Sequence, residues 1–161
     1  MIVRRPLILV LMLAVMALAR PAAADLTGFI GATTAPTTRL ASGVAVGFSL
    51  LIVGFEFEYS WAGESQPELA PSLATGMFNV LLQTPVPIAR TQFYATAGAG
   101  VYRERLGDLQ ETNFGVNVGG GAKITLAGPL RLRLDYRFFK LQGSAIQSRP
   151  QRFYAGLNLA F

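Results

Sequence analysis

Apolar residues alternate with polar or small residues through most of the chain. The clearest example is residues 153–161, where every second residue is apolar and the residues between them are Tyr154, Gly156, Asn158 and Ala160. In residues 130–139, leucines and aromatic residues alternate with four charged residues that fall on one face. A period of two is typical of a β-strand that faces two different environments, and a half-buried helix would not produce it.

Eight segments have this alternation to a greater or lesser degree. They are residues 26–34, 42–48, 51–61, 72–83, 92–102, 113–124, 130–139 and 153–161. The second and third segments nearly run together, and we place the turn between them near Ser49 and Leu50. Most segments are close to the length at which a tilted strand crosses a bilayer, which is about ten residues.

The glycines indicate which face points inward. They fall on the polar face, together with the charged residues, at Gly54, Gly98, Gly100, Gly115, Gly119, Gly121 and Gly156. Small residues fit the crowded interior of a closed eight-stranded barrel, which has little room beyond its own side chains. We therefore predict an all-β protein, a closed eight-stranded antiparallel up-and-down transmembrane β-barrel whose apolar face points outward.

Two further features give this barrel an orientation. Aromatic residues of the apolar face form two predicted interfacial belts, with Tyr59, Trp61 and Phe114 near one end and Phe48 and Phe93 near the other. The odd-numbered connectors are polar and mostly longer, at residues 35–41, 62–71, 103–111 and 143–150. Outer-membrane barrels have short periplasmic turns and longer external loops, so both termini are expected in the periplasm. The connector Thr84–Arg90 is longer than this rule expects.

The first 24 residues have the pattern of a secretory signal peptide. Arg4 and Arg5 precede an apolar run of thirteen residues, Leu7–Ala19, and small residues lead to Ala24. The run is too short for a membrane helix, which needs about 20 residues. We predict cleavage near Ala24 and one domain over residues 25–161. Without the signal peptide the net charge falls from +5 to +2, and no basic patch suggests a nucleic-acid partner.

Composition removes much familiar chemistry. The chain has no histidine and no cysteine, which excludes thiolate metal sites, disulfides and histidine general bases. We predict no catalytic residues, no cofactor and no metal site. Glu56 and Glu58 lie two residues apart on one strand, but in a filled lumen they have no substrate cleft, so a hydrolase role is disfavoured.

The mature chain resembles the small outer-membrane β-barrel proteins of Gram-negative bacteria, including the transmembrane domain of OmpA and the opacity-type surface proteins. Its most specific match is the terminal-strand signal that such proteins present to the barrel-assembly machinery, here Phe153, Leu157, Leu159 and Phe161. The resemblance implies the outer membrane as location and its lipid and lipopolysaccharide as partners. Enzymes among the proteins that it resembles use a histidine in their catalytic groups. This chain has no histidine, so the resemblance does not imply an enzyme.

Charged residues of the polar face would meet inside the barrel. Glu56 and Glu58 lie four strands away from the second group, so we expect them on the wall opposite Arg131, Arg133, Asp135 and Arg137. Arginine and carboxylate groups that meet across a narrow lumen can satisfy one another, which would plug it. An ion path with arginine-set selectivity is the alternative. Arg149 and Arg152 flank Pro150, and we assign both to the last connector.

Three functional hypotheses follow. The first is a non-enzymatic structural or surface protein with a plugged lumen and short external loops for envelope contacts. The second is a narrow pore for ions or small solutes, and the third is a soluble periplasmic barrel that binds an apolar ligand. A closed barrel has no free edge strand, so we expect a monomer.

Overall fold

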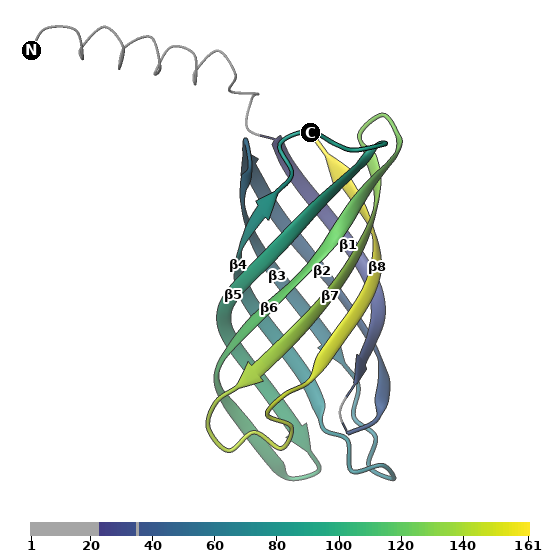
Figure 1. Ribbon diagram of the computed structural model, residues 1–161. Coiled ribbons are helices and arrows are strands. Elements are labelled where there is room, and N and C mark those ends of the chain that lie inside the picture. Colours follow the sequence, from purple (N-terminus) through teal and green to yellow (C-terminus); the bar gives the residue numbers. More distant parts are fainter. Residues whose placement is uncertain (1–22, 35) are drawn as a thin grey trace, which may run out of the picture.

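The computed structural model of the protein describes residues 23–161 except residue 35, and these residues form one closed barrel (Figure 1). Its strands are β1 (Ala23–Thr34), β2 (Thr38–Leu50), β3 (Val53–Ala62), β4 (Ser72–Gln83), β5 (Thr91–Leu106), β6 (Leu109–Ala127), β7 (Leu130–Leu141) and β8 (Gln151–Ala160). Each strand pairs antiparallel with the next, and β8 pairs with β1. The predicted fold class is confirmed. No helix in the described residues is long and apolar enough to cross a membrane.

The two ends of the barrel differ in what they carry. The terminal end, which is uppermost in Figure 1, holds Ala23, Phe161 and the connections 51–52, 84–90 and 128–129. The loop end holds the connections 35–37, 63–71, 107–108 and 142–150. Most of the predicted export segment, Met1–Ala24, lies outside the described residues. Ala23 and Ala24 begin β1, and Ala24 exchanges two backbone hydrogen bonds of 2.9 Å with Phe161.

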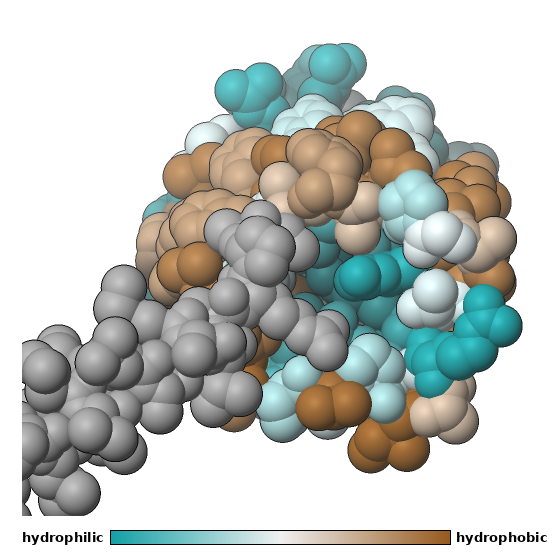
Figure 2. All heavy atoms as spheres, turned by 90° about the horizontal axis from the view of Figure 1, so that it is seen from above, coloured by the Kyte–Doolittle hydropathy of each residue, from teal (hydrophilic) through white to brown (hydrophobic). Residues whose placement is uncertain are grey.

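The barrel is apolar outside and polar inside, as predicted. On β3 the side chains of Glu56 and Glu58 are buried in the lumen, whereas Phe57 between them is 51% exposed. The same alternation runs around the barrel, and Figure 2 shows a hydrophilic centre with hydrophobic residues on the outside. The pleat of each strand produces this difference, because successive side chains point to opposite faces.

The turn between β2 and β3 lies two residues later than we predicted. Leu50 pairs with Val53, so the turn consists of Leu51 and Ile52 rather than residues near Ser49 and Leu50. Leu51 has a positive φ of 55°, a conformation usually taken by glycine or asparagine. The sequence has no such residue here, so the turn is fixed by strand pairing and carries no local signal.

The predicted loop over residues 103–111 is wrong. β5 and β6 continue as a paired hairpin that turns at Gly107 and Asp108, with Gly107 at a φ of +58°. Its charged residues misled the prediction, because Arg103 and Arg105 continue the outward face while Glu104 continues the inward one. The connections 35–37 and 128–129 are also shorter than predicted. Turn 107–108 is shorter than the terminal-end connection 84–90, so connector length alone does not orient this barrel.

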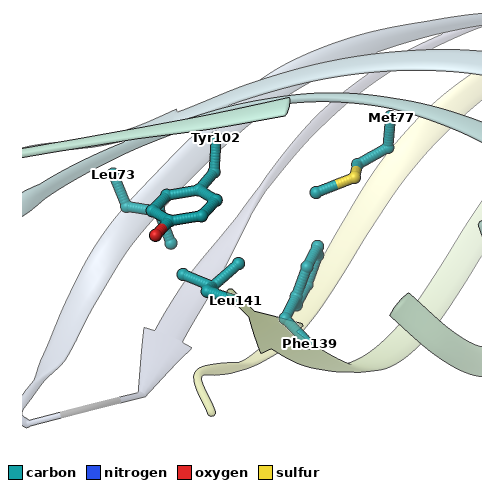
Figure 3. Packing of buried hydrophobic residues seen from close by; sticks show 5 residues of the cluster. All are labelled: Leu73, Met77, Tyr102, Phe139 and Leu141. Atoms are coloured by element: carbon teal, nitrogen blue, oxygen red, sulfur yellow. The ribbon is translucent and has the colours of Figure 1, made fainter. Parts of the chain in front are cut away.

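One part of the lumen is apolar. Five buried side chains from β4, β5 and β7 point toward one another in the loop half of the barrel (Figure 3), namely Leu73, Met77, Tyr102, Phe139 and Leu141. We call this the apolar plug. Ala145 of the last loop packs against it, so loop and plug together fill this part of the lumen.

Candidate functional site in the lumen

The buried charges of β3 and β7 meet across the barrel. Glu56 and Glu58 come from β3, and Arg133, Asp135 and Arg137 come from β7, four strands away around the ring. All five are almost completely buried. They lie in alternate positions of their strands, which directs each of them inward.

Arg133 joins the two walls. Its Nη1 contacts Glu56 Oε2, while its Nη2 lies 3.2 Å from both Glu56 Oε1 and Asp135 Oδ2. The guanidinium also lies 5.0 Å from the centre of the Tyr94 ring and 5.6 Å from that of Tyr154. The planar guanidinium therefore combines a two-pronged carboxylate contact with contacts to aromatic rings, which the ammonium of a lysine cannot reproduce in this form.

Arg137 has three carboxylate partners. Its Nη2 lies 3.0 Å from Glu56 Oε1 and 3.2 Å from Glu58 Oε2, and its Nε lies 2.9 Å from Asp135 Oδ1. Glu56 accepts from both arginines, so the ion pairs form one connected network and not isolated pairs. Removing one member would leave a buried charge without its partner, which is far more costly than the net value of an intact pair.

Two ion pairs were missed by the sequence analysis. Arg152 of β8 contacts Glu58, and Lys123 of β6 lies 2.6 Å from Asp25 of β1. Arg152 follows Pro150, and for that reason we placed it in a connector. It lies two residues before the inward residue Tyr154 and therefore points to the same face. Lys123 stands alone among glycines on its face and gave no clustered signal. Extending the inward periodicity by one position would have placed Arg152 and Asp25 on the inward face, where Lys123 already lay, but it would not have identified their partners.

Arg131 does not join the network. It lies at the start of β7, toward the terminal end, and is only partly buried. No ion pair connects it to another residue in the described part of the chain. The lumen cluster therefore contains five of the six residues proposed from the sequence, together with Arg152, and the Asp25–Lys123 pair lies beside it.

The buried charges balance. Among the described residues, five buried carboxylates, Asp25, Glu56, Glu58, Glu104 and Asp135, accompany five buried cations, Arg39, Lys123, Arg133, Arg137 and Arg152. Neutral polar groups extend the network, because Asn79 Nδ2 lies 3.4 Å from Glu56 Oε1 and Asn117 Nδ2 lies 2.9 Å from Asn79 Oδ1. The lumen is thus crowded with polar groups that hydrogen-bond one another, which suits a structural plug.

Side-chain hydrogen bonds also hold the loops. Glu104 accepts hydrogen bonds from the backbone N–H groups of Ile146 and Gln147, at 2.7 and 3.3 Å. Arg39 donates to the carbonyl of Gly63 at 2.8 Å. Glu64 accepts from the Gly107 N–H at 2.9 Å, and this hydrogen bond lowers the pKa of the Glu64 carboxyl. Each long loop is therefore tied to a neighbouring strand or turn.

The outward residues named from the sequence all lie on the exterior. The aromatic residues Phe48, Tyr59, Trp61, Phe93 and Phe114 are between 43% and 53% exposed. The terminal-strand residues Phe153, Leu157, Leu159 and Phe161 also point outward. Tyr59 and Trp61 end β3 at the loop end, while Phe48 and Phe93 lie near the terminal end.

Among the described residues, the two lumen glutamates that could form an acid–base pair are already engaged by cations. Glu56 and Glu58 are both buried and ion-paired, and the chain has no histidine. Within the described residues, no group of three potential ligand side chains is arranged to hold a metal ion.

An apolar exterior around an ion-paired polar lumen, in a closed eight-stranded barrel, is the architecture of small outer-membrane β-barrels. Comparison with solved structures agrees. The chain is similar to neisserial surface protein A, NspA, with a TM-score of 0.70 and 14% identity over 89% of this chain and 99% of that one. It is also similar to the N-terminal β-barrel domain of Pseudomonas aeruginosa OprF, with a TM-score of 0.64 and 14% identity over 86% of this chain and 97% of that one.

The same fold supports different roles. The outer-membrane enzyme PagL matches with a TM-score of 0.56 and 13% identity, over 84% of this chain and 98% of PagL. Ail, the attachment invasion locus protein of Yersinia pestis, matches with a TM-score of 0.54 and 9% identity over 88% of this chain and all of that one. No protein-family model and no curated protein sequence matches the chain. The likeness therefore establishes the fold, and function must be argued from the residues.

Proposed function

We propose that the protein is a non-enzymatic structural or surface protein of the outer membrane of a Gram-negative bacterium. In this proposal residues 1–24 direct export and are removed, both termini face the periplasm, and the loop end faces outward. The observation that carries the proposal is the inverted barrel, in which exposed apolar side chains surround a lumen filled by paired charges. Such an exterior is stable in lipid and unfavourable in water.

The filled lumen favours a structural role over the alternative of a narrow pore. Arg133 and Arg137 both reach the opposite wall, and the apolar plug fills the lumen toward the loop end. An ion crossing the barrel would have to displace these side chains. The soluble ligand-binding barrel is disfavoured for a different reason, because the apolar face that would line its cavity points outward.

The residues also support a role without catalysis. PagL is an enzyme with this fold, so the architecture alone does not decide the matter. In this chain the two lumen glutamates are held in ion pairs, and no histidine is available as a general base.

The proposed partners follow from the exterior. The apolar surface would contact outer-membrane lipid and lipopolysaccharide, and the terminal residues Phe153, Leu157, Leu159 and Phe161 would engage the barrel-assembly machinery. Because β1 pairs with β8, the described sheet has no open edge that would drive association, and we propose a monomer that binds no nucleic acid.

Heat-modifiability tests this proposal. The unheated protein in detergent should migrate faster on a gel than the boiled protein, and in cells it should fractionate with the outer membrane. A soluble protein without a mobility shift would refute the proposal. The variant Val118→Arg sharpens the test, since Val118 is 56% exposed on the middle of β6. In a bilayer it should destabilise the barrel by about 2–4 kcal/mol, whereas Gln110→Arg in the projecting hairpin should have little effect.

A further inference from the structure

A groove with a volume of about 390 Å³ runs along the outside of β4 in its loop half. Ala74 and Gly76 form its floor, and larger side chains of β3 and β5 stand on either side. The groove arises because the outward residues of β4 are small in this half and large in the other, where they are Phe78, Val80 and Leu82. Its volume is within the range of about 300–1,000 Å³ typical of small-molecule pockets.

The walls of the groove are apolar. Phe57 and Tyr59 line it from β3, and Val101 lines it from β5. A Cβ atom added at Gly76 would meet only the Phe57 Cζ and Val101 Cγ2 atoms, both at 3.9 Å, so the floor is open toward the exterior. The groove therefore presents an apolar surface on the outer face of the barrel, which would be turned toward lipid.

A cation stands at the loop end of this groove. Arg103 lines it, is exposed, and pairs through its backbone with Ala74 on one side and Thr112 on the other. No ion pair connects its guanidinium to another side chain in residues 23–34 and 36–161. Trp61 pairs with Ala74 as well, so Arg103 lies in the same row of residues as an aromatic residue of the predicted interfacial belt.

The chemistry of this arrangement fits an anionic lipid. An apolar groove in the hydrocarbon region would hold an acyl chain, and an arginine at the interface would bind a phosphate of the headgroup through charge-assisted hydrogen bonds. We propose that the groove binds one acyl chain of the phosphorylated glycolipid of the outer leaflet, the lipid A part of lipopolysaccharide, with a lipid A phosphate at Arg103. This inference rests on the proposed function, which places the loop end at the outer leaflet.

The single tryptophan of the chain provides a local probe. Trp61 is 53% exposed and one strand away from Ala74, so a brominated acyl chain in the groove would quench its fluorescence. The folded protein is placed in phosphatidylcholine vesicles that contain a small share of brominated lipid, either phosphatidylglycerol or phosphatidylcholine. We expect the anionic lipid to be enriched beside Trp61 about fivefold over the neutral one. This is the ratio that corresponds to about 1 kcal/mol for the contact between one arginine and an anionic headgroup.

Three variants separate the groove from general attraction to an anionic surface. Arg103→Gln should abolish the preference, and Gly76→Leu should weaken quenching by filling the groove. Lys140→Gln is the matched control, because Lys140 is an exposed outward cation of β7 on another wall, and it should leave the preference unchanged. Equal quenching by both lipids in the unmodified protein, an unchanged preference in Arg103→Gln, or an equal loss in Lys140→Gln would each overturn the proposal.

Unbrominated lipid A identifies the occupant. Added to the vesicles, it should displace the brominated anionic lipid and restore Trp61 fluorescence in the unmodified protein. Failure to restore the fluorescence would overturn the assignment of the groove to lipid A. Heat-modifiability of every sample is measured in parallel. A protein that inserts and shifts on heating but shows no lipid preference contradicts only this inference, whereas loss of insertion contradicts the proposed function itself.

Discussion

At the scale of single residues, the lumen is stabilised by guanidinium groups that are shared between carboxylates. Glu56 receives both Arg133 and Arg137, and Arg137 also contacts Glu58 and Asp135. The desolvation of so many charges consumes most of the Coulomb attraction that they gain. Each of these charges is therefore tolerable only where its partners are.

Replacement of Arg137 tests this dependence. Arg137→Ala removes the cation that bridges β3 and β7 and leaves Glu56, Glu58 and Asp135 with too little positive charge. We expect a loss of about 3–5 kcal/mol in the free energy of unfolding, measured by urea titration in detergent or vesicles. Arg131→Ala is the control, since Arg131 has no ion pair within the described residues, and it should change stability by less than about 1 kcal/mol. Equal effects of the two substitutions would contradict the cross-lumen network.

Glu64 gives a contact that depends on pH. The hydrogen bond from the Gly107 N–H lowers the pKa of this carboxyl, so folding favours its ionised form. The contact is fully present above the ordinary glutamate pKa of about 4.3 and is lost as the pH falls through the lower folded value. The amide resonance of Gly107 should therefore titrate with a midpoint below about 4.3. An unaltered titration in Glu64→Gln would show that another group is responsible.

At the scale of elements, the strands follow from periodicity and the connections follow from pairing. The strand Ser72–Gln83 was predicted with its observed bounds because every second residue from Ala74 to Leu82 is small or apolar and prolines at positions 71 and 85 lie just outside it. Leu51 shows the limit of such prediction, since a leucine with positive φ looks like any other apolar residue in the sequence. Glu104 shows another limit, because a charge that faces a lumen is indistinguishable from a loop charge until the partner strand is placed.

The last strand combines two roles that can be separated by experiment. Phe161 is 72% exposed and directly follows Ala160, which pairs with Asp25 at the seam between β8 and β1. Deletion of Phe161 removes an outward side chain that the assembly machinery would recognise, while most of the β1–β8 pairing remains. We expect slower assembly in cells, measured by pulse-chase of the heat-modifiable form, with little change in the unfolding of assembled barrel. Normal outer-membrane levels would contradict the proposed signal.

At the scale of the whole molecule, two different groups of side chains fill the lumen. The apolar plug occupies the loop half, and the ion-paired network joins the walls elsewhere. The network was partly predictable from the sequence, because strict alternation places Glu56, Glu58 and the charges of β7 on the inward face. The contributions of Asp25, Lys123 and Arg152 were not, because none has another charge close to it on its own strand and their partners are known only once the ring of strands closes.

Because both groups of side chains fill the lumen, we predict that the barrel does not conduct ions. In planar bilayers the purified protein should show no steady single-channel current, apart from rare brief openings. Arg137→Ala should increase the frequency of openings by loosening the network, while Lys140→Gln, on the outside of the same strand, should not. A steady current from the unmodified protein would favour the narrow pore over the structural role.

The balance of buried charges also determines how the barrel responds to an electric field. Five carboxylates and five cations are buried among the described residues, so their summed charge is zero. Each elementary charge carried across a membrane exchanges about 2.3 kcal/mol with a potential of 100 mV. Displacement of the balanced set as one body would transfer no net charge and would therefore exchange no such energy. With all ten groups ionised, this set therefore has no gating charge when it moves as one body, and a transmembrane voltage exerts no net force on it.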